Sequence, residues 1–462
     1  MSSTASAPHP SAIRTEASAL WRLAWPILTG QLATVGMSVA DVAMTGHASA
    51  MELAAVSVGA AIWSIVSVTV IGIMMAINSL VAHEVGAGNH AAIPHLVRQS
   101  LWKALLIGLL ACVFANCAVL VFDHIGLERD VRDKAAAFVH IISLGLPALA
   151  ATRTLYGYST SLNQTKPMMV VALGGLGYNI VMNWLLIYGH FGFPAMGGVG
   201  CAVATASGLW LMLGAMVYWI RRAPAYRSTY PFDRMEGPHL PEIRRMLHLG
   251  MPIGVSYFAE VSAFAIVGLL VARFGVVQMS AHQIALNFSS LVFMVPLTFG
   301  IALVTRVGHA LGEGDPRRAR FAAEVGLGLS LAFAVLSAIA ILICRTQIAQ
   351  AYTTDPQVQE MARHLLLFAA IFQLSDAAQV GAACAIRGYN VTRMPMVIHL
   401  AAFWLFAVPL GCLLGLAPGW APLAPAVPMG AAGFWIGLVV GLTVAAVALC
   451  VYLDRLSRSR IG

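Results

Sequence analysis

Long apolar stretches recur along the whole chain and constrain its fold more than any other feature. Stretches of roughly 20 apolar residues or more, the length that crosses a bilayer as a helix, begin near Leu20, Met51, Leu96, Ala135, Pro167, Gly197, Leu247, Met279, Ala319, Met361, Met394 and Gly430. Only 10% of the 462 residues are charged, against about 25% in soluble domains. Because a helix satisfies its own backbone hydrogen bonds in lipid, we predict an all-α integral membrane protein with twelve transmembrane helices.

The second half of the sequence repeats the first. A shift of 226 residues aligns Pro26 with Pro252 and His83 with His309, and it matches the segment HEVGAGN to HALGEGD. Six predicted spans therefore repeat as six, which gives both halves the same orientation in the membrane, as in transporters built from parallel repeats. We expect two six-helix lobes related by pseudo-two-fold symmetry along the membrane normal.

The expected domain boundaries follow from this repeat and from polarity. The two lobes would comprise residues 20–220 and 246–453. Residues 221–245, with four prolines and six arginines, form the only long polar segment inside the chain and would connect the lobes on the cytoplasmic side. A disordered cytoplasmic tail over residues 1–19 and a short cytoplasmic tail over residues 454–462 complete the prediction.

The net charge of +8 is explained by membrane topology. With both termini in the cytoplasm, 20 of the 27 Lys and Arg residues, Lys103 among them, fall on the cytoplasmic side and 6 on the external side, while Arg153 alone falls within a span. This bias is the positive-inside pattern, so the basic charge requires no nucleic-acid partner. The seven cysteines include no Cys-x-x-Cys pair, and they indicate neither a disulfide framework nor a zinc site.

Three carboxylates stand inside the long apolar runs. Asp41, Glu260 and Asp376 are each the only acid in their run. An ionised carboxylate in a bilayer is costly without a partner or a polar cavity, so such residues usually mark ion or substrate pathways. At about 1.5 Å per residue, Glu260 and Asp376 both fall near the middle of the membrane, where they could share one cation. The alternative is that each is protonated and hydrogen-bonded. Asp41, nearer the external face, could likewise be a helix-end group that faces water.

Further polar residues in the spans are candidates for cavity or relay roles. Asn179 and Asn183 are spaced i, i+4 and so face one side of a helix. A place in an ion pathway and plain interhelical hydrogen bonding both fit this spacing. For Arg153 we favour pairing inside the protein over a role in the cavity, since long cationic side chains commonly snorkel or find internal partners.

Two short motifs resemble enzyme signatures but fail on their context. The segment GEGD beginning at Gly312 matches the G-x-G-D of intramembrane aspartyl proteases, yet Pro316 and two arginines follow it in a polar loop. His83-Glu84 begins a zinc-protease phrase, but Ala87 stands at the position of the second histidine. We find no nucleophile or metal constellation in the sequence, and we predict a secondary active transporter and not an enzyme.

Several stretches together resemble the multidrug and toxic compound extrusion (MATE) transporters, especially the NorM-like branch. They are GMSVADVAMTG from Gly36, LAAVSVGAAIW from Leu53, GAGN from Gly86 and YNIVMN from Tyr178, together with the helix that bears Glu260. Each stretch is short and apolar, but their order and spacing extend the resemblance over nearly the whole chain after its tail.

The resemblance implies an antiporter whose two lobes surround a cavity that opens alternately to either face of the bacterial inner membrane. It would export cationic amphiphilic drugs and toxic compounds in exchange for sodium or protons, without a cofactor and with membrane lipid around it. Because the two fused halves together would complete a transport pathway, one copy of the chain would be enough, and we expect a monomer. The alternative is a lipid or oligosaccharide flippase of the wider superfamily, for which we would expect several cations lining the cavity.

The resemblance also assigns roles residue by residue. Glu260 and Asp376 match the cation-pocket acids of the C-terminal lobe, where a sodium ion is a candidate ligand, and Asp41 matches the essential acid of the N-terminal lobe. Asn179 and Asn183 match the polar pair on the fifth helix. Phe372, one turn before Asp376, departs from the tyrosine of some NorM-like members. Its ring can face a cation, but it offers no hydroxyl ligand.

Overall fold

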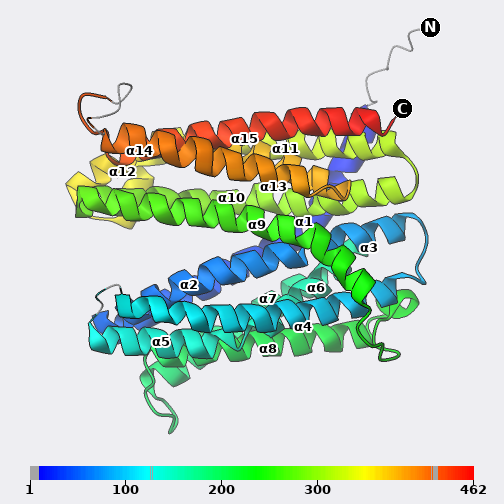
Figure 1. The fold of residues 1–462 in the computed structure, drawn as a ribbon, viewed down its shortest axis with the longest axis horizontal. Coiled ribbons are helices and arrows are strands. Elements are labelled where there is room, and N and C mark those ends of the chain that lie inside the picture. The colour runs from blue at the N-terminus through cyan, green and yellow to red at the C-terminus, as the bar shows by residue number, and fades with distance from the viewer. Residues whose placement is uncertain (1–9, 125, 127, 418, 420–424, 462) are drawn as a thin grey trace. The chain divides into compact units, whose positions relative to one another are not determined.

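The chain is almost entirely helical in a computed structural model, which describes residues 10–124, 126, 128–417, 419 and 425–461 (Figure 1). No strand occurs among these residues. The helices of the first half are α1 (Pro10–Ala48), α2 (Ala50–Met74), α3 (Ala76–Gly86), α4 (Ile93–Ala118), η1 (Val119–His124), α5 (Arg129–Ser143), α6 (Leu146–Ser161), α7 (Lys166–Tyr188), α8 (Gly198–Arg222) and η2 (Pro224–Thr229). Those that follow are α9 (Leu240–Val271), η3 (Ala272–Phe274), α10 (Val276–Gly312), α11 (Pro316–Tyr352), α12 (Pro356–Gly388), α13 (Arg393–Leu400), η4 (Ala401–Ala407), α14 (Val408–Leu416) and α15 (Ala431–Ser459).

The number of spans agrees with the prediction. In the described residues, 11 helical segments are long and apolar enough to cross a membrane, and the pair α5 and α6 makes a twelfth when it is counted as one span bent by 41°. Pro147 lies in the first turn of α6, where a missing N–H is tolerated because the first helical N–H groups have no intrahelical acceptor. The all-α multi-pass membrane fold is therefore confirmed.

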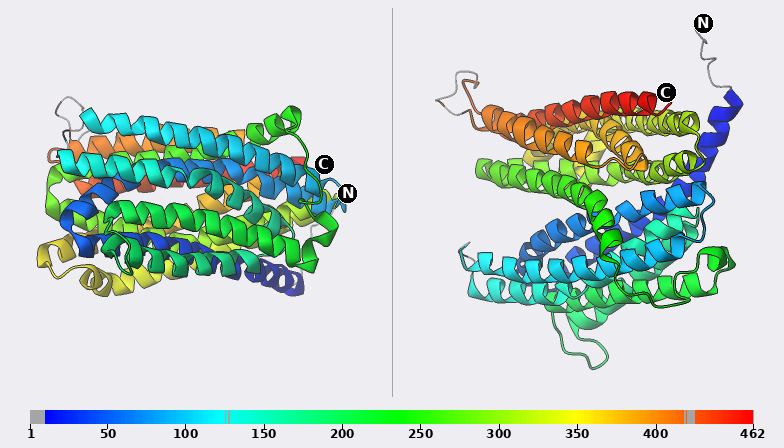
Figure 2. Two further views of the ribbon diagram at one scale, coloured as in Figure 1. Left: turned by 90° about the horizontal axis from the view of Figure 1, so that it is seen from below. Right: turned by 45° about the vertical axis from the view of Figure 1, so that its right-hand side comes forward.

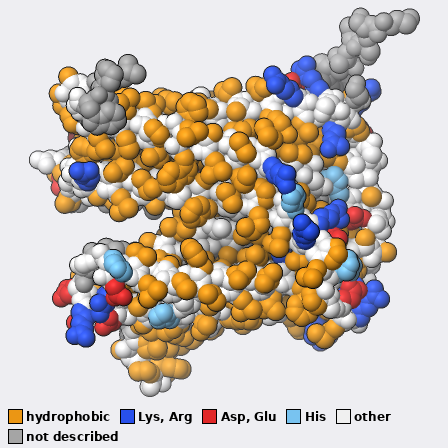
Figure 3. Space-filling model, viewed as in Figure 1, with side chains coloured by type: hydrophobic (Ala, Val, Ile, Leu, Met, Phe, Trp, Pro, Cys, Tyr) orange, Lys and Arg blue, Asp and Glu red, His pale blue; other side chains and the backbone are white. Residues whose placement is uncertain are grey.

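The surface has the character expected of helices in lipid. Large apolar side chains are exposed along the outer faces of single helices, such as Leu110 and Phe114 on α4 and Leu336 and Ile343 on α11. Hydrophobic side chains cover the sides of the helices in view, whereas Lys, Arg, Asp and Glu gather toward helix ends (Figure 3). On a soluble protein such apolar faces would be unusual, and here they are the surface that contacts acyl chains.

The helices form two compact units whose limits differ from the boundaries drawn in the sequence. The first unit is Pro26–Val261, and the second combines Ser262–Gly462 with the chain up to Trp25. Both limits fall inside long helices, α1 and α9, and not in the connector. The first limit coincides with Pro26, which lies within α1 and removes one of its backbone hydrogen bonds.

The residues expected to form terminal tails are helical where the structure describes them. Helix α1 begins at Pro10, so residues 10–19 are ordered, and residues 1–9 lie outside the described part. The reason is packing: Leu20 and Leu23 lie in an apolar cluster of the second unit with Ala302 and Leu303. At the other end, α15 continues to Ser459, so most of the predicted tail after residue 453 is helix as well.

In the first unit, α2, α4, α5, α6 and α8 pack around an apolar core that includes Met74, Phe138 and Ile142. Helix α7 packs on α8, which brings the polar side chains of these two helices together. This arrangement positions the first candidate site.

In the second unit, α12 is surrounded by α10, α11 and α15. Helix α14 runs alongside α15 (Figures 1 and 2). Their contact is made by Gly411 and Gly415 on α14 and by Gly433 and Gly437 on α15, with backbone atoms in direct contact. Small residues spaced by four are the usual means by which membrane helices approach closely.

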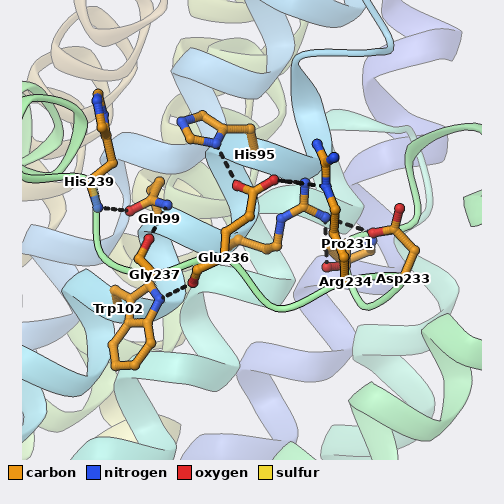
Figure 4. A network of polar contacts seen from close by, with 10 residues as sticks. His95, Gln99, Trp102, Pro231, Asp233, Arg234, Glu236, Gly237 and His239 are labelled. Atoms are coloured by element: carbon orange, nitrogen blue, oxygen red, sulfur yellow. Dashed lines mark hydrogen bonds and ion pairs between the residues drawn. The ribbon is translucent and has the colours of Figure 1, made fainter.

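The connector between α8 and α9 is fastened to the start of α4. Arg98, buried on α4, donates from Nη1 to the Asp233 carboxylate at 2.7 Å and from Nη2 to the Glu236 carboxylate at 2.6 Å. His95 Nδ1 lies 2.6 Å from the other Glu236 oxygen. These partners surround one carboxylate with cationic and donor groups (Figure 4), and the Arg98 and His95 contacts lower the pKa of Glu236 to about 2.

Backbone groups of the connector complete this attachment. The side-chain amide of Gln99 donates to the carbonyl of Gly237 at 3.0 Å and accepts from the N–H of His239 at 2.7 Å. Trp102 Nε1 donates to the carbonyl of Glu236 at 2.8 Å (Figure 4). Residues 236–239 are therefore fixed on α4, although the sequence indicated only a polar linker.

Candidate functional site

Asp41 lies at the centre of a polar cluster inside the first unit. The amide of Asn183 donates to Asp41 Oδ1 at 2.6 Å, and the amide of Asn179 donates to the same oxygen at 3.1 Å. The hydroxyl of Thr205 donates to Oδ2 at 3.0 Å. Three helices, α1, α7 and α8, each contribute to this cluster, and every one of these neighbours acts as a donor toward the carboxylate.

The donors are also bonded to one another. Asn183 Nδ2 donates to Asn179 Oδ1 at 3.2 Å, and Asn179 Nδ2 donates to Thr205 Oγ1 at 3.2 Å. Both asparagines are almost fully buried, and Asn183 Oδ1 has no hydrogen-bond partner among the described residues. The side chain of Asp41 is only partly buried. The cluster therefore holds oxygen atoms available to a cation, with the carboxylate at its more accessible edge.

Part of this cluster was predicted from the sequence. The i, i+4 spacing of Asn179 and Asn183 placed both on one face of α7, and the structure brings this face to Asp41. Thr205 was missed. It stands in the small-residue stretch CAVATAS on α8, where a single threonine resembles the many that bond to their own helix backbone, and no spacing marks it as different.

Asp376 is buried on α12 in the second unit, with a different set of partners. Its side chain is 4% exposed. The amide of Gln379, one turn later on the same helix, donates to Asp376 Oδ1 at 3.1 Å. Gln379 Oε1 lies 2.7 Å from His399 Nε2 on α13. The sequence singled out Asp376 but neither Gln379 nor His399, because a glutamine and a histidine in apolar helices have no characteristic spacing of their own.

Phe372 packs among aromatic rings. Its ring centroid lies 6.0 Å from that of Phe264 and 5.7 Å from that of Trp435, both in edge-to-face geometry. The residue is buried in the apolar core of the second unit. Phe372 therefore helps to build the apolar wall beside Asp376, and its role toward a cation stays a prediction.

Glu260 lies on α9 and is half-buried. It belongs to the first unit, one residue before its limit at Val261, whereas Asp376 belongs to the second. The neighbouring turn of α9 is packed closely: a Cβ on Gly72 of α2 would lie 2.7 Å from Tyr257 Cδ2. That Glu260 and Asp376 share one cation stays a prediction.

Arg153 lies on α6 in contact with an aromatic ring. Its guanidinium carbon is 5.8 Å from the centroid of the Tyr156 ring, one turn later on the same helix. Such an approach of a cation to a ring face is favourable. The contact is internal, in line with the pairing that we favoured, and a cavity or relay role for Arg153 remains a prediction.

Lys103, which the sequence assigned to the cytoplasmic side, is buried inside the first unit. It lies about three turns inside α4, and its side chain is fully buried. Its ammonium group donates to the carbonyl of Ile73 at 3.4 Å, next to the break between α2 and α3 at Met75. An irregular helix turn leaves a carbonyl in need of a donor, and the long lysine side chain supplies one. The sequence did not predict this burial.

Acids surrounded by donors, on helices long and apolar enough to span a bilayer, are typical of membrane transport proteins. The family model described as MatE matches residues 26–185 and 252–413. These two matches begin at Pro26 and Pro252, the prolines that the 226-residue shift aligns. The chain belongs to the MatE family.

Curated relatives place it in the NorM-like branch, among secondary transporters rather than enzymes. It is 43% identical to the multidrug resistance protein PmpM of Pseudomonas aeruginosa, over 96% of this chain and 93% of that protein. It is 40% identical to the probable multidrug resistance protein NorM of Chromobacterium violaceum, over 97% of this chain and 96% of that one.

Solved structures share the fold. The eukaryotic MATE transporter AtDTX14 superposes with a TM-score of 0.86 at 19% sequence identity, over 97% of this chain and 100% of that one. An outward-facing multidrug resistance MATE family transporter also gives a TM-score of 0.86, at 17% identity, with 96% of each chain covered. The described residues contain no group of three or more His, Cys, Asp or Glu side chains arranged to hold a metal ion.

Proposed function

We propose that this protein exports cationic amphiphilic drugs and other toxic compounds in exchange for sodium ions or protons. Its relatives are named multidrug resistance proteins, which supports small organic molecules as substrates. The observation that carries the proposal is the cluster around Asp41, where a carboxylate within a span is held by three side-chain donors. A carboxylate can accept about four hydrogen bonds, and Asn183 Oδ1 in the same cluster has no hydrogen-bond partner among the described residues, so the cluster retains acceptor sites for a cation.

The cluster is suited to reversible ion capture. Oxygen atoms are the ligands that hard cations prefer, and Asp41, Asn179, Asn183 and Thr205 supply them from three helices. When a proton or a sodium ion binds Asp41, it removes the charge to which the two amides and the hydroxyl donate, so these hydrogen bonds weaken. Since α1, α7 and α8 each hold one part of the cluster, ion binding can change how these helices pack.

Asp376 and Glu260 supply the second half of the proposed mechanism. A buried carboxylate attracts a cation, and the bound cation removes the charge that opposed burial. If the ion binds the outward-open and inward-open states unequally, its binding shifts the equilibrium between them. Drug binding would favour the reverse shift, so that inward ion flow drives drug export. One positive charge moving inward supplies about 2.3 kcal/mol per 100 mV.

We further propose that the protein works as a monomer in the bacterial inner membrane, with both termini in the cytoplasm. The positive-inside bias of Lys and Arg supports this orientation. The arginine-rich connector and both termini would then share the cytoplasmic side, as an even number of spans requires.

The test is transport by the purified protein in liposomes. An imposed sodium gradient, an imposed pH gradient and a membrane potential would each be applied alone to vesicles containing the fluorescent cation ethidium. We expect at least one ion gradient to drive ethidium movement against its own gradient. The absence of gradient-driven movement, in vesicles shown to contain folded protein, would refute the proposal and would direct attention to lipid translocation.

A further inference from the structure

The environment of Asp376 contains a hydrogen-bonded chain that leads away from the carboxylate to another helix. Asp376 and Gln379 lie on α12, and His399 lies one residue before the end of α13. The Gln379 amide bonds to Asp376 Oδ1 at 3.1 Å and its carbonyl to His399 Nε2 at 2.7 Å. All three side chains are at most 4% exposed. The two links therefore join an acid to an imidazole with no water between them.

The direction of the hydrogen bonds in this chain is fixed. An amide has one donor end and one acceptor end. Because the NH₂ group of Gln379 faces the carboxylate, its oxygen faces His399, and His399 Nε2 must carry a proton to donate to it. With a single proton on the ring, Nδ1 is then an acceptor. This atom is buried and has no hydrogen-bond partner in the described part of the chain, so the histidine is held in this tautomer at the cost of an unsatisfied atom.

A cation at Asp376 competes with the Gln379 donor. The amide NH₂ group stabilises the ionised carboxylate, and a proton or a sodium ion removes the charge to which that group donates. His399 Nε2 holds Gln379 Oε1 and so keeps the NH₂ group on Asp376. The contact of His399 with Gln379 therefore favours the empty, ionised site over the ion-bound one.

His399 is well placed to pass a change in the occupancy of Asp376 to the backbone. The residues directly after α13, Ala401–Ala407, form a π-helix, a rare conformation that is found frequently at functional sites. The ring of His399 also lies 6.4 Å from that of Phe403 within this segment. The charged group that acts electrostatically on His399 is the guanidinium of Arg387 on α12. Its Nη1 donates to Cys384 Sγ at 3.9 Å.

We propose that His399 is a positioning residue for ion binding at Asp376, acting through the Gln379 amide. It orients the donor toward the empty carboxylate and so sets how strongly the site holds an ion. This inference rests on the proposed coupling role of Asp376, because the orientation of the Gln379 amide affects transport only if an ion binds at Asp376.

The experiment compares ion dependence with drug dependence in liposomes. The variants are His399→Phe, which keeps a ring but removes both nitrogens, and His399→Gln, which keeps a group that can donate and accept. We expect His399→Phe to lower the ion concentration for half-maximal ethidium export by about twofold to tenfold, the effect of one hydrogen bond between neutral groups, because the donor is no longer held on the empty carboxylate. The ethidium concentration for half-maximal export should stay unchanged, and His399→Gln should return the ion dependence toward that of the wild type.

The control is His282→Phe. His282 is equally buried in the same unit, and it accepts a hydrogen bond from Trp435 Nε1 at 3.1 Å. An ion dependence of His399→Phe equal to that of the wild type, or equal shifts in His399→Phe and His282→Phe, would overturn the inference. If His399→Phe does not fold, Gln379→Met breaks the same chain and must give the same shift.

Asp376→Asn separates this inference from the proposed function. Should Asp376→Asn retain normal ion dependence, the coupling role itself fails. Should Asp376→Asn lose ion-driven export while His399→Phe and Gln379→Met behave as the wild type, only the role of His399 is refuted.

Discussion

The side-chain amide of Asn183 donates to the carboxylate of Asp41 at 2.6 Å and so joins α7 to α1 within the first unit. Asn179 and Thr205 bind the same carboxylate. The carboxylate of Asp41 therefore belongs to a hydrogen-bonded network, and we expect substitutions at Asp41, Asn179, Asn183 and Thr205 all to reduce transport.

Asp41→Asn tests this network at its centre. The variant keeps the shape of the side chain but removes its charge, and its own NH₂ group would face the donor amides. We expect export of ethidium to fall by at least about tenfold, the loss of one hydrogen bond to a charged group, with normal amounts of folded protein. The measurement is export from vesicles at saturating ion gradient.

Thr205→Val tests the member that the sequence did not reveal. The variant removes one of the side-chain donors to Asp41, so we expect a smaller loss of export than in Asp41→Asn and an altered dependence on ion concentration. Thr34→Val is the matched control, because the Thr34 hydroxyl on α1 bonds to the carbonyl of Gly30 on its own helix. Equal export by both threonine variants would show that Thr205 is only a packing residue.

Gly437→Ala tests the contact of α14 with α15. A Cβ at this position would lie 2.5 Å from the carbonyl oxygen of Ala407 and 2.6 Å from the backbone nitrogen of Gly411. Because backbone atoms cannot move aside as flexible side chains do, we expect a loss of about 1–3 kcal/mol in stability, measured by thermal unfolding in detergent. Gly214→Ala, on α8, is the control, since nothing lies within 4 Å of its added methyl group. A Gly437→Ala protein as stable as the wild type would contradict the close packing.

Lys103→Met tests the cost of the buried ammonium group. Methionine has a similar length and no charge, and Lys103 has one backbone acceptor at 3.4 Å. Since burying a charge with few partners is unfavourable, we expect the variant to be more stable than the wild type by about 1–2 kcal/mol. A lower unfolding temperature would mean that the bond to Ile73 stabilises the break between α2 and α3 by more than desolvation costs.

Glu236 gives the attachment of the connector a dependence on pH. Its pKa is about 2 in the folded protein, below the ordinary value of 4.5, because Arg98 and His95 favour the ionised form. The attachment is therefore at full strength above pH 4.5 and weakens as the pH falls toward 2. Hydrogen exchange of residues 231–239, corrected for the intrinsic effect of pH, should rise across this range.

Glu236→Gln should show the weakened attachment already at neutral pH. Trypsin cleavage after Arg227 and Arg234 provides the measurement, and we expect faster cleavage in this variant. Glu242→Gln is the control, because in the described part of the chain Glu242 forms its ion pair with Arg245 of the same helix, α9. If trypsin cleaves the connector at the same rate in the wild type, Glu236→Gln and Glu242→Gln, the contacts of Glu236 do not hold the connector in place.

The sequence was sufficient for the fold because the signals of membrane helices are strong. Runs of apolar residues predicted the spans, and the two matches of the family model begin at the prolines that the 226-residue shift aligns. The extent of single helices was harder to predict. Residues 10–19 were taken as a disordered tail because they are rich in Ser and Ala, whereas Glu16 forms a two-point ion pair with Arg306 at 2.7 and 2.6 Å that no local pattern reveals.

The sites were predicted only where spacing carries information. The i, i+4 asparagines and the lone acids stood out, since each is unusual in an apolar helix. Thr205, Gln379 and His399 did not, because their importance arises from residues far away in sequence. The burial of Lys103 was missed for a related reason: its position near the start of a predicted span suggested a solvated residue, and only the packing of α4 buries it.

The most direct test of the account is ethidium export in Glu260→Gln and Asp376→Asn under an imposed sodium or proton gradient. The account predicts that each variant, present in normal amount and still able to bind ethidium, loses gradient-driven export. Export by both variants at the wild-type rate, with the same dependence on the ion gradient, would contradict it.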